Sequence, residues 1–195
     1  MVNRKKVLIS IVIPCYNEQE VILNSFESIN SYKNTLVQEG RIHKDSFLVF
    51  IDDGSNDDTW GLLNDIKSKY SGVSIIKLSR NFGHQNALMA GLLYSNGKVD
   101  CAISIDADLQ QDHLIIENMI TKYANGVELV YAVRHKRVGE SYVKKVLSNF
   151  YYKLIKAMGV DVIQNHADFR LHGKKSLKTL ARYKERQLFL RGIFP

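Results

Sequence analysis

The sequence predicts an α/β protein whose central sheet is mostly parallel and covered by helices on both faces. Short apolar runs rich in β-branched residues alternate along the chain with longer segments whose apolar residues recur at helical spacing. This alternation is typical of parallel strands joined by crossover helices. The length of 195 residues, 45% of them hydrophobic, suits one domain with a sizeable core. We therefore expect a single domain over residues 1–195.

The predicted elements follow one another in regular order. The first apolar run, "VLISIVI" (7–13), follows a basic start and superficially resembles a secretion signal, but it is short, β-branched and lacks a small-residue cleavage site. We interpret it as the first strand. Further strands are predicted at 46–51, 73–79, 100–105 and 127–133. Helices are predicted between the strands, at 19–37, 60–70, 84–95 and 109–124.

Charge is distributed unevenly along the chain. The net charge is +7, and residues 131–195 hold 15 of the 27 Lys and Arg but only 4 of the 20 Asp and Glu. Such a segment can face nucleic acid, an anionic membrane surface or a phosphorylated substrate, or can simply be a solvated face. Nucleic acid is disfavoured because no nucleic-acid-binding motif occurs. Two cysteines are too few for a disulfide scaffold and favour a reducing compartment. The sequence has no run of 18 apolar residues, so no membrane-spanning helix is predicted in it.

Polar sequences follow the first four predicted strands: "PCYNE", "DDGSND", "RNFGHQ" and "DADLQ". In parallel α/β sheets, ligands bind beyond the carboxyl ends of the strands, near a reversal of strand order. We expect the site where these four segments converge. A glycine-rich dinucleotide turn and a P-loop are both absent from the sequence, which disfavours the corresponding nucleotide-binding classes.

Two carboxylates, Asp106 and Asp108, follow the apolar run "CAISI" directly. Carboxylates at the end of a buried strand need a positive partner. Mg²⁺ commonly binds one or two carboxylates together with substrate phosphates, so a divalent cation carrying a diphosphate would satisfy both groups. Taken alone, an Asp-x-Asp pair is a weak signal, because acidic pairs at strand ends are common.

Four segments together, "SIVIPCYNEQE", "VFIDDGSNDDT", "RNFGHQNALMAGL" and "SIDADLQQD", resemble in order and spacing the family 2 glycosyltransferases. The later stretches "VYAVRHKRVGES", "NHADFRLHGKKSL" and "ERQLFLRGIFP" resemble the polyprenyl-phosphate branch, which includes dolichyl-phosphate mannose synthases and bacterial undecaprenyl-phosphate glucosyltransferases. The resemblance covers essentially the whole chain. It implies the GT-A nucleotide-diphospho-sugar transferase fold, with a mostly parallel, Rossmann-like sheet.

The resemblance also implies roles for individual residues. The nucleotide-sugar-binding set is Pro14, Tyr16, Asn17, Glu18, Asp52 or Asp53 at the base, Asp106 and Ala107. The implied ligands of Mg²⁺ or Mn²⁺ are Asp106, Asp108 and Gln110. The implied catalytic groups are Asp108, Arg134 near the phosphates, and Asp168 at the position usually assigned as catalytic base. The residues expected near the acceptor phosphate are Arg170, Arg186 and Arg191.

The implied reaction is inverting, metal-dependent transfer of a hexose from a nucleoside-diphosphate sugar to a polyprenyl phosphate. UDP-glucose is the first expectation for the donor, and a UDP-sugar is favoured over a GDP-sugar, with UDP-N-acetylhexosamine and GDP-mannose left open as donors. Residues 1–133 would bind the donor, and the basic residues 134–195 would face the acceptor at the cytoplasmic face of the membrane. The membrane-spanning helices of full-length relatives are absent from this sequence, and an oligomer is compatible with it.

Two alternatives remain open from the sequence. One is a family 2 enzyme with a hydroxyl acceptor, as in polysaccharide synthesis, where Asp168 must act as a base. A phosphate acceptor is already mostly dianionic at neutral pH, so there Asp168 can position a substrate instead. The other alternative is a non-catalytic module that binds nucleotide sugars.

Overall fold

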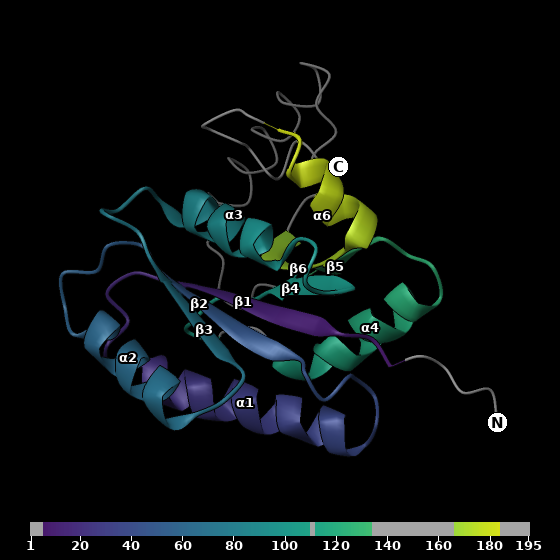
Figure 1. The fold of residues 1–195 in the computed structure, drawn as a ribbon, viewed down its shortest axis with the longest axis horizontal. Coiled ribbons are helices and arrows are strands. Elements are labelled where there is room, and N and C mark those ends of the chain that lie inside the picture. The colour runs from purple at the N-terminus through teal and green to yellow at the C-terminus, as the bar shows by residue number, and fades with distance from the viewer. Residues whose placement is uncertain (1–5, 110–111, 134–165, 184–195) are drawn as a thin grey trace, which may run out of the picture.

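The computed structural model describes residues 6–109, 112–133 and 166–183, with the side chains of residues 133 and 166–168 left out (Figure 1). Its sheet has the strand order β3-β2-β1-β4-β6-β5. The strands β1 (Ile9–Cys15), β2 (Phe47–Asp52), β3 (Val73–Lys77) and β4 (Cys101–Ser104) are parallel to one another. The predicted α/β class with a mostly parallel sheet is therefore confirmed.

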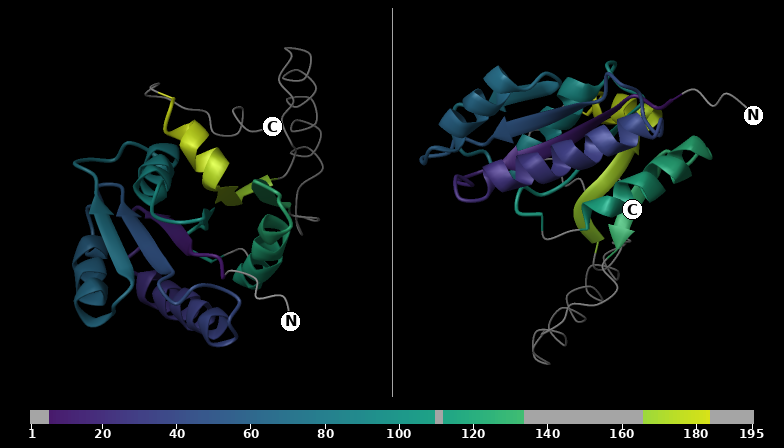
Figure 2. Two further views of the ribbon diagram at one scale, coloured as in Figure 1. Left: turned by 45° about the vertical axis from the view of Figure 1, so that its right-hand side comes forward. Right: turned by 90° about the horizontal axis from the view of Figure 1, so that it is seen from below.

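Helices cover both faces of this sheet (Figures 1 and 2). On one face lie α1 (Ile22–Gln38), α2 (Thr59–Lys69) and α4 (Ile116–Ala124), and on the other lie α3 (His84–Ser95) and α6 (Lys174–Leu180). Alternate side chains of β1 point to opposite faces of the sheet: Ile11 and Ile13 pack in the core beneath α1, and Val12 packs beneath α3. In α3, a Cβ at Gly91 would lie 2.3 Å from Val12 Cγ1, so glycine lets this helix lie close to the sheet.

One predicted helix begins later than expected. The pattern over 109–124 predicts one continuous helix, but Leu109 has a φ of +49° and a short 3₁₀ turn occupies His113–Ile115 before α4 begins at Ile116. The side chain of Asp112 accepts a hydrogen bond from the N–H of Leu114 at 3.0 Å. This local bond starts the helical turn only after the strand-end loop has finished.

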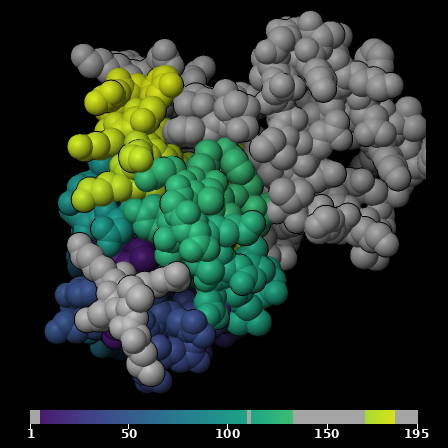
Figure 3. Space-filling view, turned by 90° about the vertical axis from the view of Figure 1, so that its right-hand side faces the viewer, coloured from purple at the N-terminus to yellow at the C-terminus, as the bar shows by residue number. Residues whose placement is uncertain are grey.

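An antiparallel strand, β6 (His166–Gly173), lies between β4 and β5 (Leu129–Val133) and was not anticipated from the sequence. Phe169 and Leu171 of β6 belong to the core beneath α1 and α4. Arg170 and His172 point to the other side and are each 1% exposed. In the space-filling view, the yellow segment with α6 lies next to the green segment that holds α4 and β5 (Figure 3).

Among the described residues, the helices are too short or too polar to cross a membrane.

Candidate active site

An open cavity lies where the strand order reverses. β2 and β3 lie on one side of β1 and β4 lies on the other, so the loops after these strands separate around a gap at their carboxyl ends. One part of the cavity is lined by Pro14, Cys15, Tyr16, Glu18, Asp53, Asn81, Gly83, His84 and Ala87. The adjoining part is lined by Pro14, Glu18, His84, Asp106, Ala107 and Asp108. Because three residues are shared, the two parts form one strand-end cavity.

Hydrogen bonds join the loop after β1 to the loop after β2. The N–H of Asn17 donates to Ser55 Oγ at 2.9 Å, and Asn17 Oδ1 accepts the N–H of Asn56 at 2.9 Å. The N–H of Glu18 donates to Thr59 Oγ1 at 2.8 Å. Asn17 itself has a φ of +55°, a conformation that asparagine tolerates better than most residues. These bonds fix the direction in which Glu18 enters the cavity.

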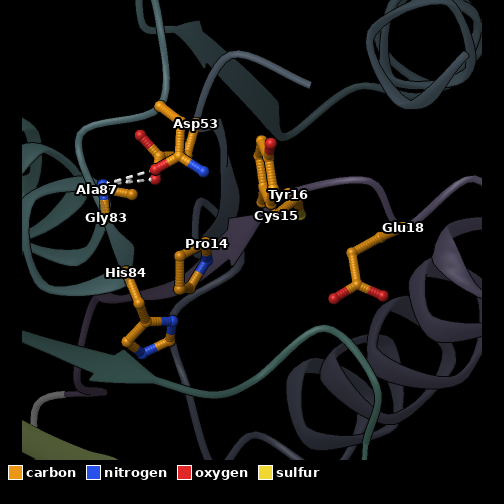
Figure 4. A pocket seen from close by; sticks show the side chains of 9 residues that line it. Pro14, Cys15, Tyr16, Glu18, Asp53, Gly83, His84 and Ala87 are labelled. Carbon is orange, nitrogen blue, oxygen red and sulfur yellow. Dashed lines mark hydrogen bonds between the residues drawn. The ribbon is translucent and has the colours of Figure 1, made fainter. Parts of the chain in front are cut away.

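Asp53 connects the loop after β2 to the loop after β3. Its Oδ1 accepts the N–H of Phe82 at 2.8 Å and its Oδ2 accepts the N–H of Gly83 at 2.9 Å. Gly54 makes this approach possible, because its φ is +69° and a Cβ there would lie 2.4 Å from the carbonyl carbon of Arg80. The carboxylate of Asp53 therefore holds one wall of the cavity in place while lining it (Figure 4).

Asp52, the last residue of β2, is fully buried. Its Oδ1 accepts the N–H of Ser55 at 3.1 Å, and its Oδ2 has no hydrogen-bond partner among the described residues. Asp52 does not line the cavity, whereas Asp53 does. Of the two aspartates that the sequence could not separate, only Asp53 lines the cavity.

The amino end of α3 opens into the same cavity. Gly83 precedes the helix with a φ of +91°, and no side chain caps the helix start. The uncapped N–H groups of a helix amino end favour negative charge. His84, the first residue of α3, lies across the cavity from Glu18 with Pro14 between them (Figure 4). Its Nε2 is 3.6 Å from Asp106 Oδ1.

The end of β4 places two carboxylates on one side of the chain. Ala107 is buried and its carbonyl accepts a hydrogen bond from the hydroxyl of Ser25 on α1. Asp106 and Asp108, on either side of it, both line the cavity. The N–H of Leu109 then donates to the carbonyl of Asp106 at 3.3 Å, which closes a turn and keeps the carboxylates near each other.

Negative charge gathers in this cavity. Burial raises the pKa of Glu18, and the charges of Asp108, Asp57 and Asp106 raise it further. Burial also raises the pKa of the Cys15 thiol, with Glu18 and Asp52 adding to the shift, so Cys15 is an unreactive part of the wall. A dense set of carboxylates favours a cation as ligand.

The described residues include no group of three or more His, Cys, Asp or Glu that could hold a metal ion by themselves. The oxygen donors of Asp106 and Asp108 nevertheless fit a hard cation that takes its remaining ligands from water and a substrate diphosphate. Gln110, the third predicted ligand, lies outside the described residues, as do Arg134, Arg186 and Arg191.

Two other predicted residues lie on β6. Arg170 of β6 pairs with Ser104 of β4. Asp168 precedes Arg170 by two residues, and Asp106 follows Ser104 by two residues. The antiparallel register thus brings the backbone of Asp168 to the end of the sheet that carries Asp106. Arg170 is buried, with its guanidinium 5.2 Å from the ring centroid of Tyr131, and this burial disfavours direct contact with an acceptor.

The cavity also contains residues that the sequence did not single out. Asn81 and Gly83 line it, as does His84, whose Nε2 is 3.6 Å from Asp106 Oδ1. The signal available was the polar stretch "RNFGHQ" after a predicted strand. Asp57 has a structural role, because its Oδ1 accepts the N–H of Thr59 at the start of α2.

Comparison with known proteins decides the family. The model for glycosyl transferase family 2 matches residues 10–191. The chain belongs to this family. It is 43% identical over 188 residues to the uncharacterized glycosyltransferase YkoT of Bacillus subtilis, covering 96% of this chain and 56% of the relative. It is 33% identical over 186 residues to the bactoprenol glucosyl transferase of Shigella phage SfV, covering 95% and 58%.

The chain thus spans little more than half the length of these relatives. Solved structures share the fold of this family member. The mannosyltransferase PcManGT of Pyrobaculum calidifontis, in complex with GDP-Man and Mn²⁺, aligns with a TM-score of 0.64 at 14% identity, covering 96% of this chain and 50% of that one. Glucosyl-3-phosphoglycerate synthase of Mycobacterium tuberculosis, in complex with UDP, aligns with a TM-score of 0.56 at 23% sequence identity. The alignment covers 87% of this chain and 57% of that one. The predicted GT-A fold is confirmed.

Proposed function

We propose that this domain transfers a hexose from a nucleoside-diphosphate sugar to a polyprenyl phosphate, with inversion at the anomeric carbon and a divalent cation at the site. UDP-glucose is the proposed donor. The observation that carries the proposal is the convergence of Glu18, Asp106 and Asp108 on one cavity at the strand-order reversal. The similarity to bactoprenol glucosyl transferases supports the acceptor class and the sugar.

The nucleoside is proposed to occupy the part of the cavity beside Tyr16 and Asp53. Tyr16 is 40% exposed at the cavity wall, which leaves a ring face available to a base. Each oxygen of Asp53 accepts one backbone N–H and keeps a second lone pair. Asp53 is therefore the proposed acceptor for a base N–H, as in the imide of uracil, and the bonds to Phe82 and Gly83 hold it in position.

The diphosphate is proposed to lie in the adjoining part, between Asp106, Asp108 and the amino end of α3. The residues that would hold Mg²⁺ or Mn²⁺ are Asp106 and Asp108, with Gln110 as the third ligand expected from the sequence. When bound, the cation would act as a Lewis acid and stabilise the charge of the departing diphosphate. The amino end of α3 would add the positive potential of the helix dipole on the other side.

The acceptor phosphate is proposed to approach from the side of β6. A polyprenyl monophosphate is already mostly dianionic at neutral pH, so it needs positioning more than deprotonation. Asp168 is proposed to orient the acceptor or the donor sugar rather than to take a proton, because the register of β6 sets its backbone at the Asp106 end of the sheet. The 15 Lys and Arg of residues 131–195 would attract anionic lipid to this side, at a membrane surface. Direct displacement of the diphosphate inverts the sugar.

The test is a transfer assay with UDP-[¹⁴C]glucose and a short-chain polyprenyl phosphate in detergent, with Mn²⁺ or Mg²⁺ supplied. Transfer to lipid should fall at least 100-fold in Asp106→Asn and in Asp108→Asn. The matched control is Asp65→Asn, at an exposed residue of α2, and it should keep wild-type activity. Wild-type activity in both site variants would contradict the proposal, and transfer to a sugar hydroxyl but not to lipid phosphate would replace its acceptor class.

A further inference from the structure

A second polar pocket lies at the opposite, amino end of the strands. It is bounded by α1 and by the segments that lead into β2 and β3, and we call it the amino-end pocket. Its volume is about 530 Å³, within the range of pockets that bind small molecules. Lys33 of α1, Lys44 before β2 and Lys69 before β3 line it. Three lysines thus come together from three separate segments.

Lys33 is the unusual member of this set. Its side chain is on a helix face that packs toward the core, and the residue is only 6% exposed. Within the described parts of the chain, no hydrogen bond or ion pair joins its ammonium to another residue. A Cβ on Gly72 would lie 3.6 Å from its Nζ, so the ammonium reaches the turn that forms the pocket wall. Burial lowers the pKa of Lys33, as expected for an ammonium without a compensating anion.

The other groups in the pocket leave its positive charge largely uncompensated. Asp45 is the one acidic residue among the lining residues, and its Oδ2 lies 3.5 Å from His43 Nδ1. Asn30, one helical turn before Lys33, and Asn34, the residue after it, also line the pocket and add amide N–H donors. An occupant that accepts hydrogen bonds and carries more than one negative charge would match these groups.

We propose that the amino-end pocket binds a phosphate-bearing anion, either a soluble phosphate or diphosphate compound or a phospholipid headgroup. Ammonium groups on flexible stems suit phosphate as point charges. The ammonium of Lys33, which reaches the pocket, would gain a partner, with the exposed Lys44 and Lys69 on the solvent side of the ligand. This site is separate from the strand-end cavity and does not depend on the function proposed for that cavity.

The experiment is calorimetric titration of the full chain with pyrophosphate, in EDTA. Without divalent cations, the carboxylates of the strand-end cavity repel the probe, and the share of binding that the pocket variants lose and the control keeps reports the lysine pocket. We expect Lys33→Met, which keeps the length of the side chain, to weaken binding at least tenfold. The double variant Lys44→Gln/Lys69→Gln should weaken it about fivefold. The matched control, Lys122→Gln/Lys178→Gln, removes the same charge from exposed positions on α4 and α6 and should change affinity less than twofold.

Vesicles of phosphatidylglycerol, with phosphatidylcholine as reference, distinguish the two sources of phosphate. Loss of vesicle binding in the pocket double variant but not in the control double variant, together with no binding of pyrophosphate, assigns the site to a lipid headgroup. Equal losses in the two double variants, or wild-type affinity in Lys33→Met, would overturn the proposal, as would failure of both probes to bind. If Lys33→Met does not fold, as judged by circular dichroism, the two exposed double variants decide the outcome.

Discussion

Acidification should destabilise this domain through one buried histidine. His172 lies on β6 between β4 and β5, and burial, with the charge of Arg170 adding to it, lowers its pKa from 6.5 to about 3. Its Nδ1 is 3.0 Å from Ser176 Oγ. In the folded protein this imidazole stays neutral well below neutral pH, whereas in the unfolded chain it takes up a proton below about pH 6.5.

The size of the effect follows from proton linkage. Between the folded and unfolded pKa values the unfolded state binds more protons, so the free energy of unfolding rises with pH. The stabilising contribution of His172 is fully present above about pH 6.5. Lowering the pH from 7 to 5 should remove about 2 kcal/mol of stability through this one group. The result at pH 5 depends on the unfolded pKa alone, provided that the folded pKa is well below 5.

Urea unfolding at pH 5, 6 and 7 measures this contribution when the wild type is compared with His172→Gln. The variant keeps a polar partner for Ser176 but cannot titrate in this range. All other groups are common to both proteins, so the difference in stability between them should change by about 2 kcal/mol from pH 7 to pH 5. Parallel stability curves, with a change below about 0.5 kcal/mol, would show that His172 takes up its proton in the folded state and would refute the argument.

Three further changes test other parts of the structure. Gly54→Ala should cost at least about 2 kcal/mol in urea unfolding, because it combines a positive φ with a Cβ 2.4 Å from backbone, and near-wild-type stability would contradict the close loop approach. Lys33→Met should raise the free energy of unfolding by up to about 1 kcal/mol in anion-free buffer, since it removes a partly desolvated charge from a residue that is 6% exposed, and a loss would contradict that account. UDP should bind in calorimetry at least tenfold more tightly with Mn²⁺ than with EDTA, and Asp106→Asn should abolish the difference; metal-independent binding would argue against the proposed cation site.

Much of the fold could be predicted from local sequence pattern. The helix expected at 84–95 has those bounds, because glycine and asparagine flank an apolar helical run on either side. β6 escaped prediction for a tertiary reason. Phe169 and Leu171 alternate with Arg170 and His172, a pattern typical of a strand with one solvent-exposed face, yet both faces are buried. No local property of the chain shows that an arginine and a histidine will be covered by neighbouring segments.

The candidate site divides in the same way. The pairing of Asp106 and Asp108 could be predicted, because both follow one buried strand directly. The distinct environments of Asp52 and Asp53 could not, because they depend on a contact with a loop about thirty residues later in the chain. Gly54 permits that contact, and the N–H of Gly83 donates one of its hydrogen bonds to Asp53. Hydrogen bonds between separate loops, not local pattern, determine which carboxylate faces the cavity.

If the proposed function holds, the donor diphosphate and the acceptor phosphate are attracted to the site by different positive charges. A diphosphate entering the strand-end cavity meets Glu18, Asp106 and Asp108, and burial already disfavours the charged form of Glu18. That part of the site therefore attracts a diphosphate only when a cation accompanies it. No cation accompanies the acceptor phosphate, so the groups that attract it to the site must be the cationic side chains of the protein. Those are concentrated in residues 131–195, which hold 15 Lys and Arg against 4 acidic residues. Because mobile and fixed positive charge serve different substrates, the two phosphates need not compete for the same groups as they approach each other.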